Sequence, residues 1–197
     1  MQGTPSASEL ALNVPARPWY RAARGRDEAT LILQARGGSA EAVETLVRRH
    51  WDSAHRTAFL IVHDAAAAED IAQEAMLAAV RAIDGFDRRR PFLPWLHRIV
   101  VNRSLDWERA RRRRPEVSGE LAPAAAVPPP GDGMSTELMA ALGALDPDQR
   151  TLVVLRHVLG YRASELGRML DMPAATVRTR LARALRQLRT LLEGENG

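Results

Sequence analysis

Hydrophobic residues recur every three or four positions over most of this chain, the spacing at which side chains share one face of an α-helix. The first such stripe follows Ser39 and consists of Val43, Leu46, Val47, Ala54, Ala58 and Ile61. A second helix is predicted from Asp64, a suitable N-cap, to about Ile83, with Gly85 just beyond its end. Its buried edge is formed by Ile71, Ala75, Ala79 and Ile83.

A third helix is predicted from about Phe92 to Arg114, with Pro94 in its first turn and Pro115 as its stop. The side chains expected to pack inward are Trp95, Leu96, Ile99 and Val100. Residues 115–134 contain five prolines and three glycines, which predicts a linker. Residues 1–27 mix Pro, Gly and Ser with little periodicity, so we expect a mostly disordered extension.

Four further helices are predicted after the linker, and they form a second unit at residues 135–193. They cover about Thr136 to Leu145, Pro147 to Gly160, Ala163 to Leu170, and Pro173 to Leu192. The second of them opens with a capping-box pattern, in which Asp146 is the N-cap, Pro147 is the first helical residue and Gln149 follows three residues after the cap. No strand pattern is visible, so the expected fold is all-α, with two small helical domains joined by a Pro/Gly-rich linker.

Charge is divided unevenly along the chain, and all 28 basic residues are arginines. Residues 88–114 carry ten arginines against two acids, and residues 148–192 carry nine against three. Residues 37–87 instead carry nine acids against four arginines. Two basic segments beside an acidic one indicate two contacts with a polyanion and a separate surface that faces a protein.

The composition also excludes several classes of protein. The chain has no cysteine, which rules out a disulfide framework and thiolate chemistry. No apolar segment approaches the ~20 residues that span a bilayer, and the N-terminus lacks the apolar core of a signal peptide. We therefore expect a cytoplasmic protein without membrane insertion.

The segment from Ala163 to Leu192 has the pattern of a helix-turn-helix, with its turn at Asp171-Met172-Pro173. In this motif the N-terminal part of the second helix enters the major groove of DNA. One face of that helix carries Arg178, Thr179, Ala182 and Arg183. Arg180 lies off this face but within reach of a phosphate. The alternative is an arginine-rich amphipathic helix on an ordinary bundle, but the tight turn favours DNA binding.

The predicted third helix carries a polar stripe made of Arg98, Asn102, Asp106, Arg109 and Arg113. Arginines along a helix can follow phosphates, and Asn can hydrogen-bond to a base edge. Phe86, in the loop before this helix, could stack on an unpaired base. A solvated basic face would produce the same pattern.

A third candidate surface lies on the second predicted helix, away from its buried edge. It consists of Asp70, Gln73 and Glu74, with Leu77 and Arg81 beside them. This face is either a surface that docks a protein or an ordinary solvated one.

An enzymatic interpretation rests on His50, His55, His63-Asp64 and Asp70, which faintly resemble the residues of a His-Asp metal phosphohydrolase. His50 and His55 are five residues apart, which places them on different faces of a helix. The sequence contains no Gly-rich phosphate loop and no nucleophile–base pair. We therefore expect no catalysis, no metal and no cofactor.

Together these segments resemble the extracytoplasmic-function (ECF) sigma factors of the sigma-70 family, over about residues 28–114 and 136–192. In the first unit the resemblance rests on Ala68-Glu69-Asp70-Ile71-Ala72-Gln73-Glu74, Phe86, Phe92, Trp95-Leu96, Arg98-Ile99, Asn102, Asp106 and Arg109. In the second it rests on Leu145-Asp146-Pro147-Asp148-Gln149-Arg150, Leu155, Gly160, Glu165-Leu166, Thr176-Val177-Arg178-Thr179-Arg180-Leu181 and Arg183-Ala184. The order and spacing of these segments make the match specific.

The resemblance implies a promoter-specificity subunit of bacterial RNA polymerase. Residues 28–114 would be region 2, whose Asp70, Gln73 and Glu74 would bind the coiled coil on the clamp of the β′ subunit. Residues 135–193 would be region 4, whose outer surface would bind the β flap. An anti-sigma factor is a further expected partner.

The resemblance also implies a division of labour on promoter DNA. Phe86 and Asn102 would capture a base from the −10 non-template strand, and nearby phosphates would be held by Arg98, Arg109, Arg112 and Arg113. The −35 element would be met by Arg178, Thr179, Arg180, Ala182 and Arg183. A stand-alone helix-turn-helix regulator, which binds DNA without polymerase, is the alternative function.

The chain departs from the family pattern in the loop of residues 87–91, in its long extension of residues 1–27, and at two positions of the second unit. The family often has Gly where Asp171 stands, although Asp tolerates a left-handed backbone better than most residues. A Ser N-cap is usual where Arg162 stands, which predicts a frayed start for the helix that begins at Ala163.

Overall fold

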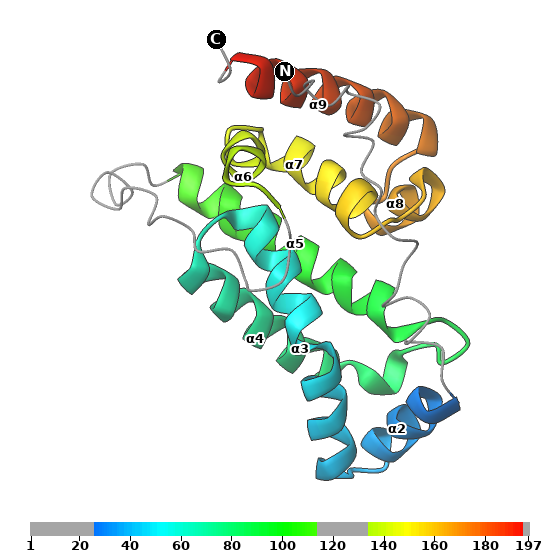
Figure 1. Cartoon of the computed structure of the whole chain (residues 1–197). Coiled ribbons are helices and arrows are strands. Elements are labelled where there is room, and N and C mark those ends of the chain that lie inside the picture. The colour runs from blue at the N-terminus through cyan, green and yellow to red at the C-terminus, as the bar shows by residue number, and fades with distance from the viewer. Residues whose placement is uncertain (1–25, 114–133, 195–197) are drawn as a thin grey trace, which may run out of the picture. The chain divides into compact units, whose positions relative to one another are not determined.

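A computed structural model describes residues 26–113 and 134–194 of the chain. Within these ranges every regular element is a helix, which confirms the predicted all-α fold. The two ranges belong to two separate compact units (Figure 1). The predicted extension at residues 1–27 and the predicted linker at residues 115–134 lie almost entirely outside the described residues. None of the described helices has both the length and the apolar character that crossing a membrane requires.

The first unit is built around one long helix, α3 (Figure 1). Its elements are α2 (Arg26–Arg36), α3 (Ala40–Val62), α4 (Ala65–Arg81), the 3-10 helix η1 (Ile83–Gly85) and α5 (Phe92–Arg113). Helix α3 contacts α2, α4 and α5. The predicted stripe on α3 is buried at Leu46, Ala54, Ala58 and Ile61 and half-buried at Val43 and Val47. The predicted buried edge of the next helix is buried at all four positions, of which Ile71, Ala75 and Ala79 lie in α4 and Ile83 lies in η1.

Short-range capping bonds set the ends of these helices. The Ser39 hydroxyl accepts a hydrogen bond from the Ala42 N–H (3.3 Å), and the Asp64 carboxylate accepts one from the Ala67 N–H (2.9 Å). Both helix starts therefore lie where the sequence predicts them. His63 is left-handed, with φ of 53°, and its N–H donates to the Phe59 carbonyl (2.8 Å). The chain consequently reverses within two residues, and α4 packs against α3.

Helix α2 is the element that the hydrophobic pattern does not predict. Its apolar residues include the consecutive run Leu31, Ile32 and Leu33, of which Ile32 is buried and Leu33 is exposed. Its first turn contains Glu28, an acidic residue that is nevertheless buried. A helical period is hard to see in such a short and mixed segment.

The second unit packs several shorter helical segments against a long final helix. Its elements are α6 (Thr136–Gly143), α7 (Pro147–Val153), the π-helix η3 (Val154–Val158), α8 (Ala163–Met169) and α9 (Ala174–Gly194). Helix α9 contacts α6, α7 and α8. The largest fully buried side chains here are Leu142, Leu152, Leu155, Tyr161 and Leu166.

The start of α7 confirms most of the predicted capping pattern. The Asp146 carboxylate accepts from the Asp148 N–H (3.0 Å), and Pro147 is the first helical residue. The reciprocal bond is absent, because the buried Gln149 Oε1 has no hydrogen-bond partner among the described residues. The single α-helix predicted up to Gly160 is also wrong. After Val153 the helix widens into a π-turn, in which the Leu159 N–H donates to the Val154 carbonyl (2.9 Å).

Candidate nucleic-acid interface

Helices α8 and α9 meet at a tight turn that depends on two particular residues. Asp171 is left-handed, with φ of 51°, the conformation that Asp was expected to tolerate at this position. The Met172 N–H donates to the Gly167 carbonyl (2.9 Å). A Cβ atom on Gly167 would lie 2.6 Å from the Met172 carbonyl oxygen, so a larger residue does not fit without a backbone shift. The turn thus fixes the direction in which α9 leaves α8.

The start of α8 is held by a bond that the sequence-based expectation overlooks. The Glu165 carboxylate accepts a hydrogen bond from the Arg162 N–H (2.6 Å), which is the glutamate half of a capping box. The predicted fraying at Arg162 is therefore wrong, because an N3 glutamate compensates for the missing N-cap side chain.

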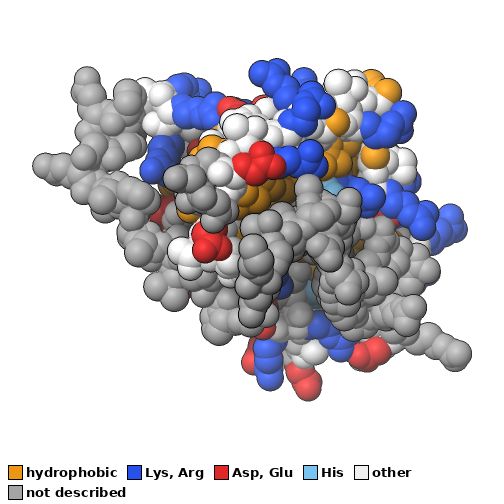
Figure 2. Space-filling view, turned by 45° about the horizontal axis from the view of Figure 1, so that its top comes forward, with side chains coloured by type: hydrophobic (Ala, Val, Ile, Leu, Met, Phe, Trp, Pro, Cys, Tyr) orange, Lys and Arg blue, Asp and Glu red, His pale blue; other side chains and the backbone are white. Residues whose placement is uncertain are grey.

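Helix α9 has an apolar inner face and a basic outer face. The inner face is buried at Val177, Leu181, Ala184 and Leu188. All five side chains predicted for −35 contact are exposed: Arg178, Thr179, Arg180, Ala182 and Arg183. Within the described part of the chain, no ion pair joins an α9 arginine to a carboxylate. In Figure 2, where the end that holds α9 comes forward, arginine side chains predominate over acidic ones among the described atoms.

Helix α5 presents a second basic face, but several of its side chains have partners within the unit. The predicted −10 residues of the helix are all exposed: Arg98, Asn102, Arg109, Arg112 and Arg113. Arg109 pairs with Asp106 (2.7 Å), and the Arg111 guanidinium lies 5.2 Å from the centre of the Trp107 ring. Part of the positive charge of α5 is therefore balanced within the helix itself.

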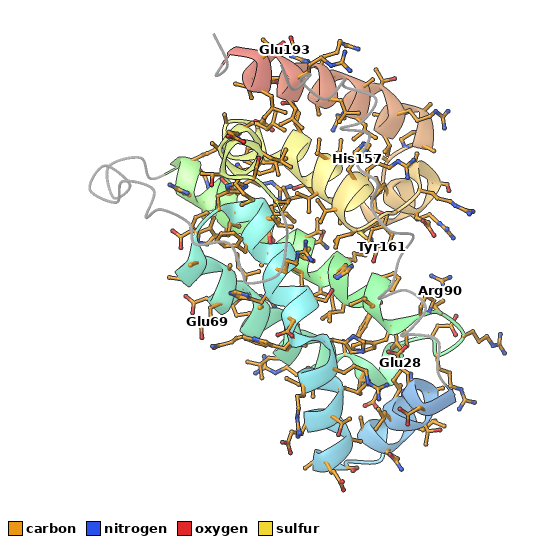
Figure 3. The ribbon with its side chains drawn as sticks, viewed as in Figure 1. Glu28, Glu69, Arg90, His157, Tyr161 and Glu193 are labelled. Carbon is orange, nitrogen blue, oxygen red and sulfur yellow. The ribbon has the colours of Figure 1, made fainter. Side chains whose placement is uncertain are left out.

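The loop before α5 begins with a buried aromatic residue, Phe86. Its side chain is only 4% exposed and packs against Phe92 (ring centres 5.6 Å apart) and Trp95 (4.8 Å). The apolar cluster therefore covers the ring that is expected to stack on an unpaired base, and stacking would require the ring to leave this cluster. The exposed part of the loop is the polar segment of residues 87–90, which includes three arginines; Arg90 is labelled in Figure 3.

Helix α4 exposes the predicted protein-docking face. Asp70, Gln73 and Glu74 are exposed on it, and Leu77 is a large apolar side chain that is 55% exposed. Glu74 pairs with Arg103 of α5 (2.5 Å). The sequence pattern places Asp70, Gln73, Glu74 and Leu77 on one face. It does not reveal the Glu74–Arg103 pair, which ties this face to α5.

Buried polar residues connect α2, α3 and α5 in the interior of the first unit. Glu28 (Figure 3) lies 3.0 Å from His50, and both side chains are almost completely buried. His97 is fully buried and shares a hydrogen bond of 2.9 Å with the Ser53 hydroxyl. Burial lowers the pKa of His97 to about 3, and the neighbouring His50 contributes in the same direction. His97 is therefore neutral, and these histidines hold the core together.

The residues of the metal interpretation have other roles in the fold. His63 and Asp64 are the C-cap of α3 and the N-cap of α4. His50 pairs with Glu28, and His55 stacks on Trp51 with ring centres 6.2 Å apart. Among the described residues, no group of three or more His, Cys, Asp or Glu side chains is placed to hold a metal ion.

Comparison with known proteins assigns both units to one family. The family model described as Sigma-70 region 2 matches residues 46–114, and the one described as Sigma-70, region 4 matches residues 135–188. The ECF RNA polymerase sigma factor SigM of Mycobacterium tuberculosis is 35% identical over 172 residues, which cover 85% of each chain. SigW of Bacillus subtilis is 31% identical, over 82% of this chain and 94% of SigW.

A solved structure agrees with these relatives. CnrH, determined in complex with the cytosolic domain of CnrY, is similar with a TM-score of 0.63 and 28% sequence identity. The similarity covers 85% of this chain and 97% of CnrH.

Proposed function

Because this chain belongs to the ECF sigma factors of the sigma-70 family, we propose that it directs core RNA polymerase to promoters by recognising −35 and −10 elements and by helping to open the duplex. The observation that carries this proposal is the pair of exposed arginine-rich faces, one on α9 and one on α5, in units that match region 4 and region 2. The protein acts by binding, in the cytoplasm, and catalyses no reaction of its own.

The −35 element is the proposed target of α9. The outer face of its N-terminal half is exposed directly after the tight turn, which suits insertion into the major groove. Arg178 and Arg183 are proposed to read guanines through O6 and N7, and Thr179 and Ala182 to contact neighbouring base edges or methyl groups. Arg180 is proposed to bind a phosphate.

The −10 element is the proposed target of α5 and the loop before it. Asn102 is proposed to hydrogen-bond to a base that leaves the stack, because its amide is exposed in the middle of the basic face. The surrounding arginines, at positions 98, 109, 112 and 113, are proposed to hold phosphates of the non-template strand. Phe86 supports the loop from the inside of the unit, because its ring is buried against Phe92 and Trp95.

Core polymerase is the proposed partner of α4. Three polar side chains around an exposed Leu77 form a mixed surface typical of protein contacts. We assign the Asp70, Gln73 and Glu74 face to the coiled coil of the β′ clamp, and the outer surface of region 4 to the β flap. An anti-sigma factor is a further proposed partner, since the similar CnrH was solved together with CnrY.

One experiment separates this function from that of a stand-alone regulator. The Asp70→Arg and Glu74→Arg double variant reverses the charge of the α4 face and leaves α9 unchanged. We expect it to lose binding to core polymerase while its binding to a −35 duplex stays unchanged. Transcription in which the double variant is as active as the wild type would instead support a regulator that does not dock on polymerase through this face.

A second experiment tests promoter opening. Asn102→Ala is expected to reduce open-complex formation, measured by permanganate reactivity of unpaired thymines, more than it reduces binding to closed duplex. Equal reactivity in the wild type and the variant would reject the role of Asn102 in base capture.

A further inference from the structure

Arg36, at the C-terminal end of α2, binds the backbone on both sides of η1. Its Nε donates to the Ile83 carbonyl (2.9 Å), and its Nη2 donates to the Phe86 carbonyl. These two carbonyls lie at the start of η1 and just after its end. Because guanidinium is a rigid fork of donors, one side chain fixes the distance and the direction between them.

The Phe86 carbonyl is the point from which the arginine loop before α5 departs. The loop is folded on itself, since the Asp87 carboxylate accepts from the Arg89 N–H (3.0 Å) and the Asp87 carbonyl from the Arg90 N–H (2.9 Å). A loop with such internal bonds can move as one piece about its attachment. The bond from Arg36 therefore determines the direction in which Arg88, Arg89 and Arg90 project.

Helix α2 is itself held firmly enough to serve as an anchor. Glu28, in its first turn, makes the buried contact with His50 of α3 (3.0 Å), and Asp27 pairs with Arg49 (2.7 Å). The His50 ring lies 5.1 Å from that of Phe92, which in turn packs against Phe86. Helix α2 therefore supports the aromatic cluster beneath the loop at one end and holds the loop backbone at the other.

We propose that Arg36 is a positioning residue for −10 recognition, which aims the loop of residues 87–90 at the displaced strand without touching DNA itself. The proposal rests on the function proposed above. It assigns a role to a helix that lies outside the Sigma-70 region 2 match at residues 46–114. It also explains how a loop whose aromatic residue is buried can present its arginines in one fixed direction.

The test compares wild type and Arg36→Met, each bound to core RNA polymerase, on four fork-junction DNAs. These DNAs copy a promoter that the wild type selects from a randomised library and differ only in the base at the most discriminating −10 position. Arg36→Met is expected to reduce the ratio between the best and the worst base by about tenfold, the order expected when a charge-assisted hydrogen bond is lost. Affinity for core polymerase should not change.

Arg48→Met is the matched control, because it removes an exposed arginine pair with Glu44 within α3 and touches neither α2 nor η1. It should keep the wild-type discrimination. A loss in Arg36→Met that is equal for all four bases, or no loss at all, would overturn the positioning role and leave Arg36 with a structural one. A library selection in which the wild type prefers no base at any −10 position would instead refute the proposed function, and the inference with it.

Arg36→Lys decides the question if circular dichroism shows that Arg36→Met does not fold. Lysine keeps the charge but lacks the planar fork that spans both carbonyls. If the ratio between the best and the worst base in Arg36→Lys is lower than in the wild type but still above one, the result supports the proposal. Full wild-type discrimination in Arg36→Lys contradicts it.

Discussion

The two basic helices, α9 and α5, carry similar charge but are prepared for DNA in different ways. The α9 arginines extend from a compact helix-turn-helix, and in the described residues none of them is paired with an acid. On α5, Arg109 pairs with Asp106, Arg103 with Glu74, and Arg111 lies over Trp107. The face on α9 is therefore ready to bind, whereas part of the α5 face is held by contacts within the protein.

This difference agrees with the two tasks proposed for the helices. Reading an intact major groove requires a rigid helix with free side chains, because the DNA keeps its shape. Capturing a base from an opening duplex depends on where a loop and a helix face stand relative to each other, and contacts within the unit can set that arrangement. The following predictions probe this contrast, from the largest expected effect to the smallest.

Gly167→Ala should destabilise the second unit by about 3 kcal/mol, because the new methyl group would meet the Met172 carbonyl oxygen at 2.6 Å. Urea unfolding followed by circular dichroism should show an early transition, together with loss of −35 binding. Gly85→Ala in the first unit is the control, since a Cβ atom there meets nothing within 4 Å. If Gly167→Ala loses no more unfolding free energy in its unit than Gly85→Ala loses in its own, the turn is not tightly packed.

Arg178→Ala should weaken binding of the polymerase complex to its preferred −35 sequence by roughly 1–3 kcal/mol, and much less to DNA with that guanine replaced. Arg48→Ala, on the exposed surface of α3, is the matched control and should change neither. Titration of fluorescent duplexes measures both values. An equal loss on every sequence would reduce Arg178 to a phosphate contact. The negative slope of log K against log salt would then become shallower by about 0.9.

Mild acid should destabilise the first unit through His97. Its folded pKa of about 3 lies below its ordinary value of 6.5, so the unfolded chain binds the extra proton first. The stability that neutral His97 contributes is thus complete above pH 6.5 and decreases as the pH falls toward 3. At pH 5 the loss is about 2 kcal/mol.

His97→Gln isolates this effect, because glutamine does not titrate. The comparison is needed because burial and the nearby Arg156 also lower the pKa of His157 in the second unit. The difference in unfolding free energy between pH 7 and pH 5 should be smaller in the variant than in the wild type. The same pH dependence in both proteins would exclude His97 as its source.

Asp106→Asn should have the smallest effect. The Asp106–Arg109 pair is exposed, so its loss should change stability by less than about 0.5 kcal/mol. It also releases Arg109, and affinity for single-stranded −10 DNA should rise about twofold at low salt. Unchanged or weaker binding would show that the pairing on α5 does not restrain its arginines.

Local sequence rules predict those parts of this fold that local interactions determine. Ser39, Asp64 and the Asp146-Pro147 pair begin helices at the predicted positions, because capping depends on neighbours within three residues. Asp171 takes the left-handed conformation expected of it. The outward faces of α4, α5 and α9 follow equally from the helical period.

Most features that the sequence does not reveal depend on residues outside the local segment, although the Arg162–Glu165 bond and the π-turn after Val153 are local. Glu28 lies buried against His50, which is 22 positions away, and Arg36 binds the carbonyls of Ile83 and Phe86, at the start of η1 and just after its end. Phe86 is buried because Phe92 and Trp95 close over it after the chain turns into α5. The helical repeat of hydrophobic residues does not predict such contacts. Helix α2 and the burial of Phe86 therefore become visible only in the three-dimensional structure.

Run-off transcription with core RNA polymerase on a randomised promoter library tests the central claim most directly. With this protein present, the selected templates should share two short sequences at a fixed spacing. Arg178→Ala should relax the upstream sequence only, and Asn102→Ala should impair the downstream one only. Transcripts that do not require the protein, or templates that share a single sequence sensitive to both substitutions, would contradict a two-element sigma factor.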